Sequence, residues 1–383
     1  SRENVDDILR LEKLYMERLS KVKAGVDTDW LAKPLRNGVG HKHSLMIELG
    51  DKNIQLVANV SYNDVVGVMK GSDRTNVAGS VFASYRNNKF KFRNELSVNM
   101  NKSNDSPYGS FAEYSKLNPY WSPVDEYGQI AKNAGDEEAF YGNPLYNATL
   151  NTKDETAYTE IRDNFSMDWS ISKAFRAVGS FSFTRQESGS DVFYPASHTK
   201  FAKYDENGMS DRKGEYTKGD GSSQTVSVQA GLNFNKTFGE HLLFANVTWN
   251  MSTARTISTT TVAEGFGNDY MDDISFATKY QKDGSPSGSN SRSREIGVIG
   301  AINYSFADRY LFDASLRKSA SSVYGSDSHW GTFWSLGAGW NVHHEKFLEG
   351  NAWIKQFKLR ASMGYTGTQN VDPVSYTHLT LPT

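Results

Sequence analysis

Cysteine is absent from the 383 residues of the chain, which excludes disulfide frameworks, thiolate metal sites and cysteine nucleophiles. Long hydrophobic runs are missing as well, since no stretch approaches the roughly 18 apolar residues that a membrane helix needs. The formal net charge is −2, so no basic field favours nucleic acid. The mean hydropathy of −0.60 suggests a soluble protein, but a membrane β-strand carries apolar residues only at alternate positions and averages out as polar.

Aromatic residues are abundant: they make up 13% of the chain, whereas hydrophobic residues as a whole make up only 38%. This combination suits a sheet with one apolar, aromatic-rich face and one wet face. Residues 1–25 are the exception, because their apolar residues follow a helical spacing among charges and Gly25 is a plausible stop. The chain begins Ser1-Arg2-Glu3, without Met or a signal peptide, and we expect the natural N-terminus of an exported protein to lie upstream.

After Trp30 the apolar period changes to two, which predicts β-strands. In one such segment Phe90 and Phe92 alternate with Lys91, Arg93 and Glu95, so that one face is aromatic and the other is charged. About twelve segments show the pattern, many of them near the 9–11 residues that a tilted membrane strand requires. They are 43–49, 54–62, 77–85, 90–100, 161–171, 175–183, 226–234, 243–251, 296–304, 310–316, 334–340 and 357–363.

The connections between these segments alternate between tight turns and long polar stretches rich in Gly, Ser, Asn and Asp. The expected turns are 50–53, 86–89, 172–174, 235–240 and 305–309, and the expected long stretches are 64–74, 102–156, 186–223, 253–292 and 319–331. Short periplasmic turns and long extracellular loops give a transmembrane barrel this alternation. The fold class predicted is therefore all-β, an antiparallel up-and-down transmembrane β-barrel with a short helical segment at its start. A soluble all-β protein whose apolar face lies in a core is the alternative.

Several segments, taken in order, resemble the barrel region of SusC/RagA transporters of the TonB-dependent class. They are Asp27 to Leu31 with Arg36-Asn37-Gly38 and His43-Ser44-Leu45, then Gly67 to Asp73, Ser106 to Phe111 with Leu117 to Tyr120, and Leu359 to Ser362 with Gly364, Thr366-Gly367 and Gln369-Asn370. The likeness runs from about Val26 to Pro373. No one motif is decisive, and their order and spacing carry the resemblance.

The resemblance implies an outer-membrane importer of oligosaccharides or peptides, driven through TonB and lidded by a SusD-like lipoprotein. It implies a 22-stranded barrel with an N-terminal plug and TonB box, so about 12 strands would be a partial barrel, which we do not expect to transport alone. Residues 1–40 are then a lead-in belonging to an extracellular loop, and residues 41–373 the partial barrel. Residues 374–383 (VSYTHLTLPT) fit nothing before them and are interpreted as a sequence artefact, with a genuine loop as the alternative.

Catalytic and metal-binding patterns are weak, and we predict no enzyme activity, no cofactor and no metal site. His343-His344-Glu345 offers ligand types, but neighbouring strand residues point to opposite faces, and the segment falls between two predicted strands, where we expect a solvated turn. His41 and His43 could share a face, yet no nearby carboxylate completes a set. Asp327-Ser328-His329 contains triad residue types, but consecutive residues cannot aim their side chains at one another.

One loop, residues 105–127, concentrates aromatic rings among Ser, Asn and Pro. Exposed flat rings bury sugar or peptide faces well. We therefore predict contact with the ligand or with the lid, and the candidates are Tyr108, Phe111, Tyr114, Tyr120 and Trp121. In the alternative the rings pack the loop onto itself. A soluble or surface-displayed carbohydrate-binding module without transport also remains open as a function.

Overall fold

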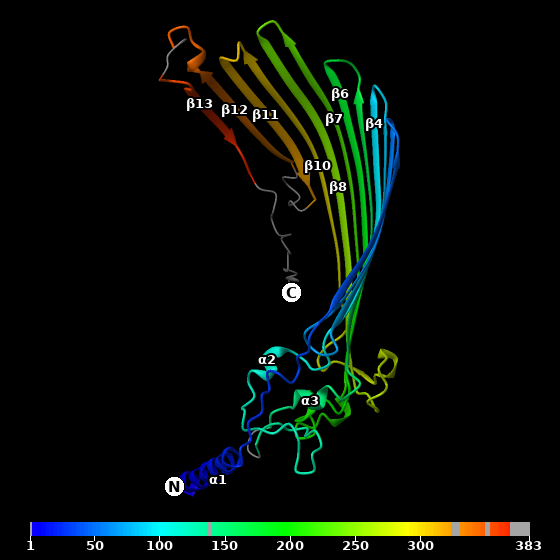
Figure 1. Ribbon diagram of the computed structural model, residues 1–383, viewed down its shortest axis with the longest axis vertical. Coiled ribbons are helices and arrows are strands. Elements are labelled where there is room, and N and C mark those ends of the chain that lie inside the picture. Colours follow the sequence, from blue (N-terminus) through cyan, green and yellow to red (C-terminus); the bar gives the residue numbers. More distant parts are fainter. Residues whose placement is uncertain (1, 137–139, 323–329, 349–352, 368–383) are drawn as a thin grey trace, which may run out of the picture.

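The computed structural model describes residues 2–136, 140–322, 330–348 and 353–367. Its main feature is one tall, curved sheet in a single layer (Figure 1), in which each strand pairs antiparallel with the next along the chain, apart from the two-residue strand Lys279–Tyr280, which lies off this path and pairs with the strand before it. The predicted up-and-down meander is confirmed. The strands are β1 (Gly40–Gly50), β2 (Ile54–Val66), β3 (Asp73–Arg86), β4 (Phe90–Asn104), β5 (Lys153–Ser170), β6 (Phe175–Tyr194), β7 (Glu215–Phe238), β8 (His241–Glu264), β9 (Lys279–Tyr280), β10 (Ser287–Phe306), β11 (Tyr310–Ser321), β12 (Trp330–Asn341) and β13 (Lys358–Tyr365).

The tight turns owe their shape to a repeated local device. The Asp51 carboxylate accepts hydrogen bonds from the backbone N–H groups of Asn53 and Ile54, at 2.7 and 2.9 Å. The Asn87 side chain accepts from Lys89 and Phe90 in the same way. Such side chains imitate a backbone turn and reverse the chain within a few residues. All these turns lie at one end of the sheet, and the long connections before residue 287 lie at the other (Figure 1).

Several of the long connections are shorter than the alternation predicts, because the strands continue beyond their apolar part. The stretch expected as loop 186–223 contains the ends of β6 and β7, which pair from Tyr194↔Glu215 onward. The stretch 253–292 likewise contains the ends of β8 and β10. The connection 64–74 shrinks to residues 67–72, between β2 and β3. Most of these additional strand residues are polar, so the regular apolar alternation that identifies a strand in the sequence is missing there. Exceptions such as Phe193 and Tyr216 are buried against Phe266.

The strand register places the apolar side chains of neighbouring strands on the same face of the sheet. Cα partners place Phe181 opposite Phe165 and Val228, and Phe312 opposite Tyr304 and Ala338. The apolar side chains of this face are exposed, with Phe181 at 39% and Phe312 at 46%. No second sheet covers them in the described part of the chain, so the packed-sheet alternative finds no support.

The helices lie at the end of the sheet that carries the long connections (Figure 1). The longest, α1 (Arg2–Lys23), confirms the helix predicted at the start, and Gly25 follows it with a φ of 75°. Short helices within the long connections are α2 (Phe111–Tyr114), α3 (Pro144–Asn147), η1 (Thr199–Phe201), η2 (Ser210–Arg212) and η3 (Ile274–Phe276), whereas η4 (Val342–His344) follows β12 at the opposite end. The predictions for 374–383 and for Asp327-Ser328-His329 fall outside the described residues. Among the described residues, no helix is long and apolar enough to cross a membrane.

Candidate functional site

The described residues of the long connections build a compact cluster of loops, which we call the loop cluster: residues 24–39, 67–72, 105–136, 140–152, 195–214 and 265–286. Its main core contains Trp30, Tyr114, Leu117, Trp121 and Ala134, all buried. The Trp30 indole donates a hydrogen bond of 3.0 Å to the carbonyl of Asn118, which ties the chain before β1 to the loop after β4. The loop cluster therefore has the packed interior that the sheet lacks.

A buried amide organises the middle of the loop 105–152. Asn143 is 0% exposed. Its amide donates to the carbonyls of Pro123 and Ala131, at 3.0 and 2.7 Å, and its oxygen caps α3 by accepting from Leu145 N–H. Sequence reasoning did not identify Asn143. The only signal was an Asn directly before a Pro, which is typical of a helix start.

Side-chain hydrogen bonds join this loop to its neighbours. Asn147 donates to the Thr199 hydroxyl at 2.7 Å and accepts from Thr199 N–H at 3.1 Å. The carboxylate of Asp136, whose side chain is 0% exposed, accepts hydrogen bonds from Nε and Nη2 of Arg18, a residue of α1. Gly71 has a φ of +80°, and a Cβ there would stand 2.4 Å from Pro107. Glycine at this position lets the loop 67–72 press against the loop 105–152.

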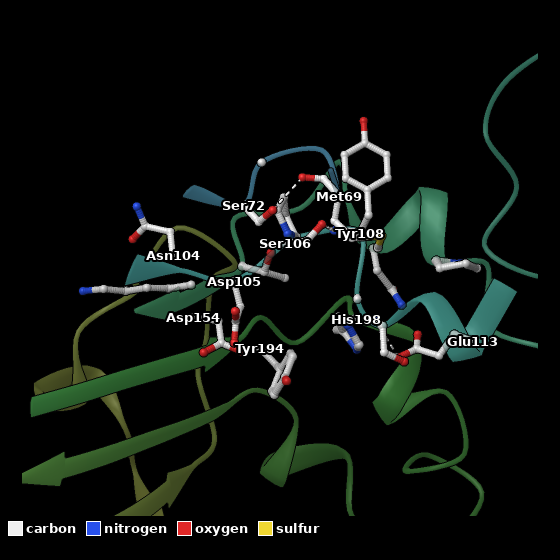
Figure 2. Close-up of a pocket in the computed structure, with 18 of the residues that line it drawn as sticks. Met69, Ser72, Asn104, Asp105, Ser106, Tyr108, Glu113, Asp154, Tyr194 and His198 are labelled. Carbon is white, nitrogen blue, oxygen red and sulfur yellow. Dashed lines mark hydrogen bonds between the residues drawn. The ribbon is translucent and has the colours of Figure 1, made fainter. Parts of the chain in front are cut away.

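A cavity of about 940 Å³ opens among these loops and the nearby strand ends (Figure 2). Its lining includes Asp105, Asp154, Tyr194 and His198, with Tyr108 and Phe111 from the aromatic loop. Asp105 and Asp154 lie side by side at the paired ends of β4 and β5, where Asp105 N–H donates to the Asp154 carbonyl at 2.8 Å. The cavity is of the size that binds small molecules or pieces of polymers.

The polar lining is rich in hydrogen-bond acceptors. Among the described residues, neither the Asp105 nor the Asp154 carboxylate has an ion-pair or side-chain hydrogen-bond partner. The buried Asn104 Oδ1 is also without a partner there. Two cations, Lys153 and Lys200, also line the cavity. Lys200 pairs with Glu215 and lies 4.9 Å from the centre of the Tyr194 ring. Ligands carrying many N–H or O–H donors therefore suit this cavity best.

Burial sets the charge states around the cavity. It raises the pKa of Asp154, and the neighbouring Asp105 carboxylate adds to the rise. Burial also lowers the pKa of His198 to about 4, with Lys200 and Lys132 acting in the same direction. His198 is thus neutral at pH 7, and its Nδ1 accepts a hydrogen bond from Lys200 N–H at 3.0 Å. At that pH the imidazole adds no positive charge to the lining.

The five predicted aromatic residues occupy different places in the loop cluster. Tyr114 and Trp121 are 1% and 4% exposed and form part of its core. Tyr108 and Tyr120 pack against that core and are partly exposed, while Phe111 is 45% exposed. Tyr108 and Phe111 line the cavity. The structure thus brings the five together in one loop, but it turns only some of them toward solvent.

The histidines considered above as possible metal ligands have other partners in the structure. His343 Nδ1 lies 2.9 Å from the Phe357 carbonyl, and the Glu345 carboxylate accepts from Tyr310 and Trp340. His41 is 4.0 Å from the Asp64 carboxylate. In the described part of the chain, no group of three or more His, Asp or Glu side chains could hold a metal ion.

Comparisons with known proteins agree with this architecture. No family model matches the chain. The chain is 24% identical over 339 residues to the TonB-dependent receptor P39 of Formosa agariphila, covering 87% of this chain and 31% of the relative. It is 40% identical over 80 residues to the TonB-dependent receptor SusC of Bacteroides thetaiotaomicron, covering 21% of this chain and 8% of SusC. The chain thus spans less than a third of the length of these relatives.

Among solved structures, the RagAB peptide transporter superposes with a TM-score of 0.71 at 17% identity, covering 91% of this chain and 39% of that one. The ferric citrate transporter FecA superposes with a TM-score of 0.51 at 9% identity, covering 86% of this chain and 42% of that one. An antiparallel meander with an exposed apolar face and long loops at one end is thus the fold of a TonB-dependent receptor barrel in the outer membrane. Within that class the chain is similar in sequence to SusC over 80 residues and in fold to the RagAB transporter.

Proposed function

We propose that the chain forms part of a TonB-dependent importer that carries oligosaccharides or peptides across the outer membrane. The acceptor-rich cavity of about 940 Å³ in the loop cluster is the observation that carries this proposal. Peptides and oligosaccharides both present many N–H or O–H donors, which the partnerless Asp105 and Asp154 carboxylates and Asn104 carbonyl would accept. The relatives named as TonB-dependent receptors support the import class.

The same proposal includes a barrel completed by further strands. The described sheet runs from β1 to β13, and these two strands do not pair with each other. Open strand edges are not tolerated in lipid, so the β-strands within residues 41–373 require additional strands to close a barrel. We propose residues 1–40 as an extracellular lead-in, since α1 joins the loop cluster through Arg18.

We also propose the partners that this class of importer needs. A SusD-like lipoprotein would cover the loop cluster, and the TonB complex would supply energy through a plug and TonB box. The aromatic loop is the candidate for contact with ligand or lid. Tyr108 and Phe111 are the sharpest candidates because they reach the cavity, whereas Tyr114 and Trp121 would act by supporting the loop from its core. Tyr120 lies between, packed on the core and partly exposed.

Uptake in cells tests the proposal. The intact receptor is returned to a strain that lacks it, either unchanged or as a Tyr108→Ala, Phe111→Ala pair. Tyr127→Ala is the matched control, because Tyr127 belongs to the same loop, is 81% exposed and is not among the cavity-lining residues. Accumulation of labelled peptides and oligosaccharides is measured with and without a functional TonB.

We expect TonB-dependent uptake of one ligand class, a several-fold reduction for the pair, and no change for the control. Ligand binding without TonB-dependent uptake would favour a surface binding module and overturn the import proposal. Normal uptake and normal lid association by the pair would leave import standing but refute a role for these two rings.

A further inference from the structure

A row of basic residues follows the apolar face of the sheet at its boundary with the polar strand ends. Arg255 of β8 and Arg292 of β10 are Cα partners across the strand pair. Arg294 lies two residues further along β10 on the same face, because side chains alternate along a strand. Lys318 of β11 is the Cα partner of Val298, which also belongs to this face. We call Arg255, Arg292, Arg294 and Lys318 the basic row.

The basic row borders the apolar band on the side of the loop cluster. On β10 the residues of this face that follow Arg294 toward the turn are Ile296, Val298, Gly300, Ile302 and Tyr304. On β8, Arg255 is preceded on the same face by Thr253, Met251 and Trp249. The cations therefore stand where lipid acyl chains give way to headgroups, if the apolar band lies in the membrane core.

The charges of the basic row are not compensated by carboxylates in the described part of the chain. All four side chains are exposed. Arg255 has a long hydrogen bond of 3.4 Å to Asn290, and Lys318 lies 5.5 Å from the centre of the Trp330 ring. Neither contact neutralises a charge. By contrast, Arg185, further along the sheet on this face, pairs with Glu187 at 2.6 Å.

Two arginines directly opposite one another repel, and like charges in such a cross-strand pair are destabilising. Arg294 adds a third positive charge to the same small area. An anion between the guanidinium groups would remove this repulsion. Guanidinium groups bind phosphate through paired hydrogen bonds, so a phosphate group suits this place well.

An apolar hollow of about 400 Å³ adjoins the basic row. Met251, Ile296 and Ala320 line it, and so does Arg294. Glu295 borders the same hollow, but alternation along β10 turns its side chain toward the other face. A cationic edge beside an apolar hollow complements a ligand with a phosphate head and an acyl chain.

We propose that the basic row and this hollow bind a phosphorylated glycolipid of the outer leaflet, with its phosphate on the arginines and an acyl chain in the hollow. The inference rests on the orientation in which the loop cluster is extracellular, because this orientation brings the basic row to the outer leaflet. A second copy of the chain or a protein partner would be a different occupant of the same face.

Lipid binding to the intact receptor tests the proposal. The receptor is purified from outer membranes, stripped of lipid in detergent, and titrated with purified lipid A. The bound lipid is counted by native mass spectrometry. Dephosphorylated lipid A, phosphatidylglycerol and inorganic phosphate are titrated in parallel. The test variant combines Arg255→Gln, Arg292→Gln and Arg294→Gln.

The matched control combines Arg86→Gln, Lys91→Gln and Arg93→Gln, which removes three positive charges from the opposite face. Each basic residue beside an anionic lipid surface strengthens binding by about fivefold. We expect lipid A to bind on the order of 100-fold more weakly to the test variant and unchanged to the control. We expect dephosphorylated lipid A and phosphatidylglycerol to bind weakly to all forms.

Thermal unfolding supplies a second measurement that does not depend on the triple variant assembling. Without lipid, Arg292→Gln alone should raise the midpoint because it removes the repulsion with Arg255. With lipid A added, the unchanged receptor should gain more stability than Arg292→Gln. The proposal is overturned if the control loses lipid A equally, if dephosphorylated lipid A or phosphatidylglycerol binds as well as lipid A, or if only inorganic phosphate binds. Dimerisation lost with the arginines, while lipid A binding persists, would assign the face to a second copy instead.

Discussion

The sheet and the loop cluster are built on opposite principles within one chain. In the sheet, the backbone ladder holds neighbouring strands together and large apolar side chains such as Phe181 and Leu316 stay exposed, at 39% and 55%. In the loop cluster, Trp30, Tyr114 and Trp121 are buried, and the buried Asn143 side chain makes hydrogen bonds to backbone groups of the loop around it. The difference shows that the sheet relies on lipid to cover its apolar face, whereas the loop cluster has to provide its own interior.

The largest expected effect tests the independence of the loop cluster. Trp121→Ala removes a large side chain from its core, and we expect a local loss of about 3–5 kcal/mol. Protease sensitivity of the loop 105–152 should rise while the barrel still migrates as a folded species on unheated gels. Tyr127→Ala, at an 81% exposed position, should change stability by less than about 0.5 kcal/mol. Loss of the folded barrel species in Trp121→Ala would show that the two regions are coupled.

A second, smaller effect tests the faces of the sheet. Phe181→Arg places a charge on the apolar face near the middle of the band, which should cost about 2–4 kcal/mol. Ser180→Arg is the matched control, because its neighbouring position points to the other face. Urea unfolding of the receptor reconstituted in lipid vesicles measures both. Equal costs for the two variants would contradict the assignment of the apolar face to lipid.

The smallest effect concerns pH and is confined to the loop cluster. The pKa of His198 is lowered to about 4 by burial, below the usual value near 6.5, so the neutral form is the one compatible with the packed loop. Its contribution is fully present above pH 6.5 and is lost as pH falls toward 4, by at most about 3 kcal/mol.

A spin label at an introduced Asn207→Cys, the sole thiol in the chain, would report this change. Label mobility should increase between pH 6.5 and pH 4. His198→Asn keeps an acceptor for Lys200 N–H but cannot titrate in this range, so it should flatten the response. The same pH dependence in His198→Asn would assign the transition to another group.

The sequence predicts the sheet better than it predicts the loop cluster. Alternation of apolar and polar residues identifies a strand only where one face meets lipid. The apolar parts of the strands and the tight turns between them are therefore predicted correctly. The ends of β6, β7, β8 and β10 are missed because most of their residues are polar and the few apolar ones do not alternate regularly. In the loop cluster, the ring-rich segment is recognisable, but which rings are buried depends on contacts such as that between Trp30 and Asn118, 88 residues apart. The roles of Asn143 and Asp136 likewise depend on distant partners.

Nearest-neighbour pairing has a consequence for how this sheet assembles. Along the path from β1 to β13 each strand contact joins strands that are consecutive in sequence, except that of β8 with β10, which passes over the two-residue β9. Most of the sheet can therefore form hairpin by hairpin with low contact order. The connection between β4 and β5 differs from the others, because a loop of about 50 residues must close before these two strands can pair. We expect this step, and the closing of the two open edges, to limit the rate of folding, with the strands from β5 onward forming early.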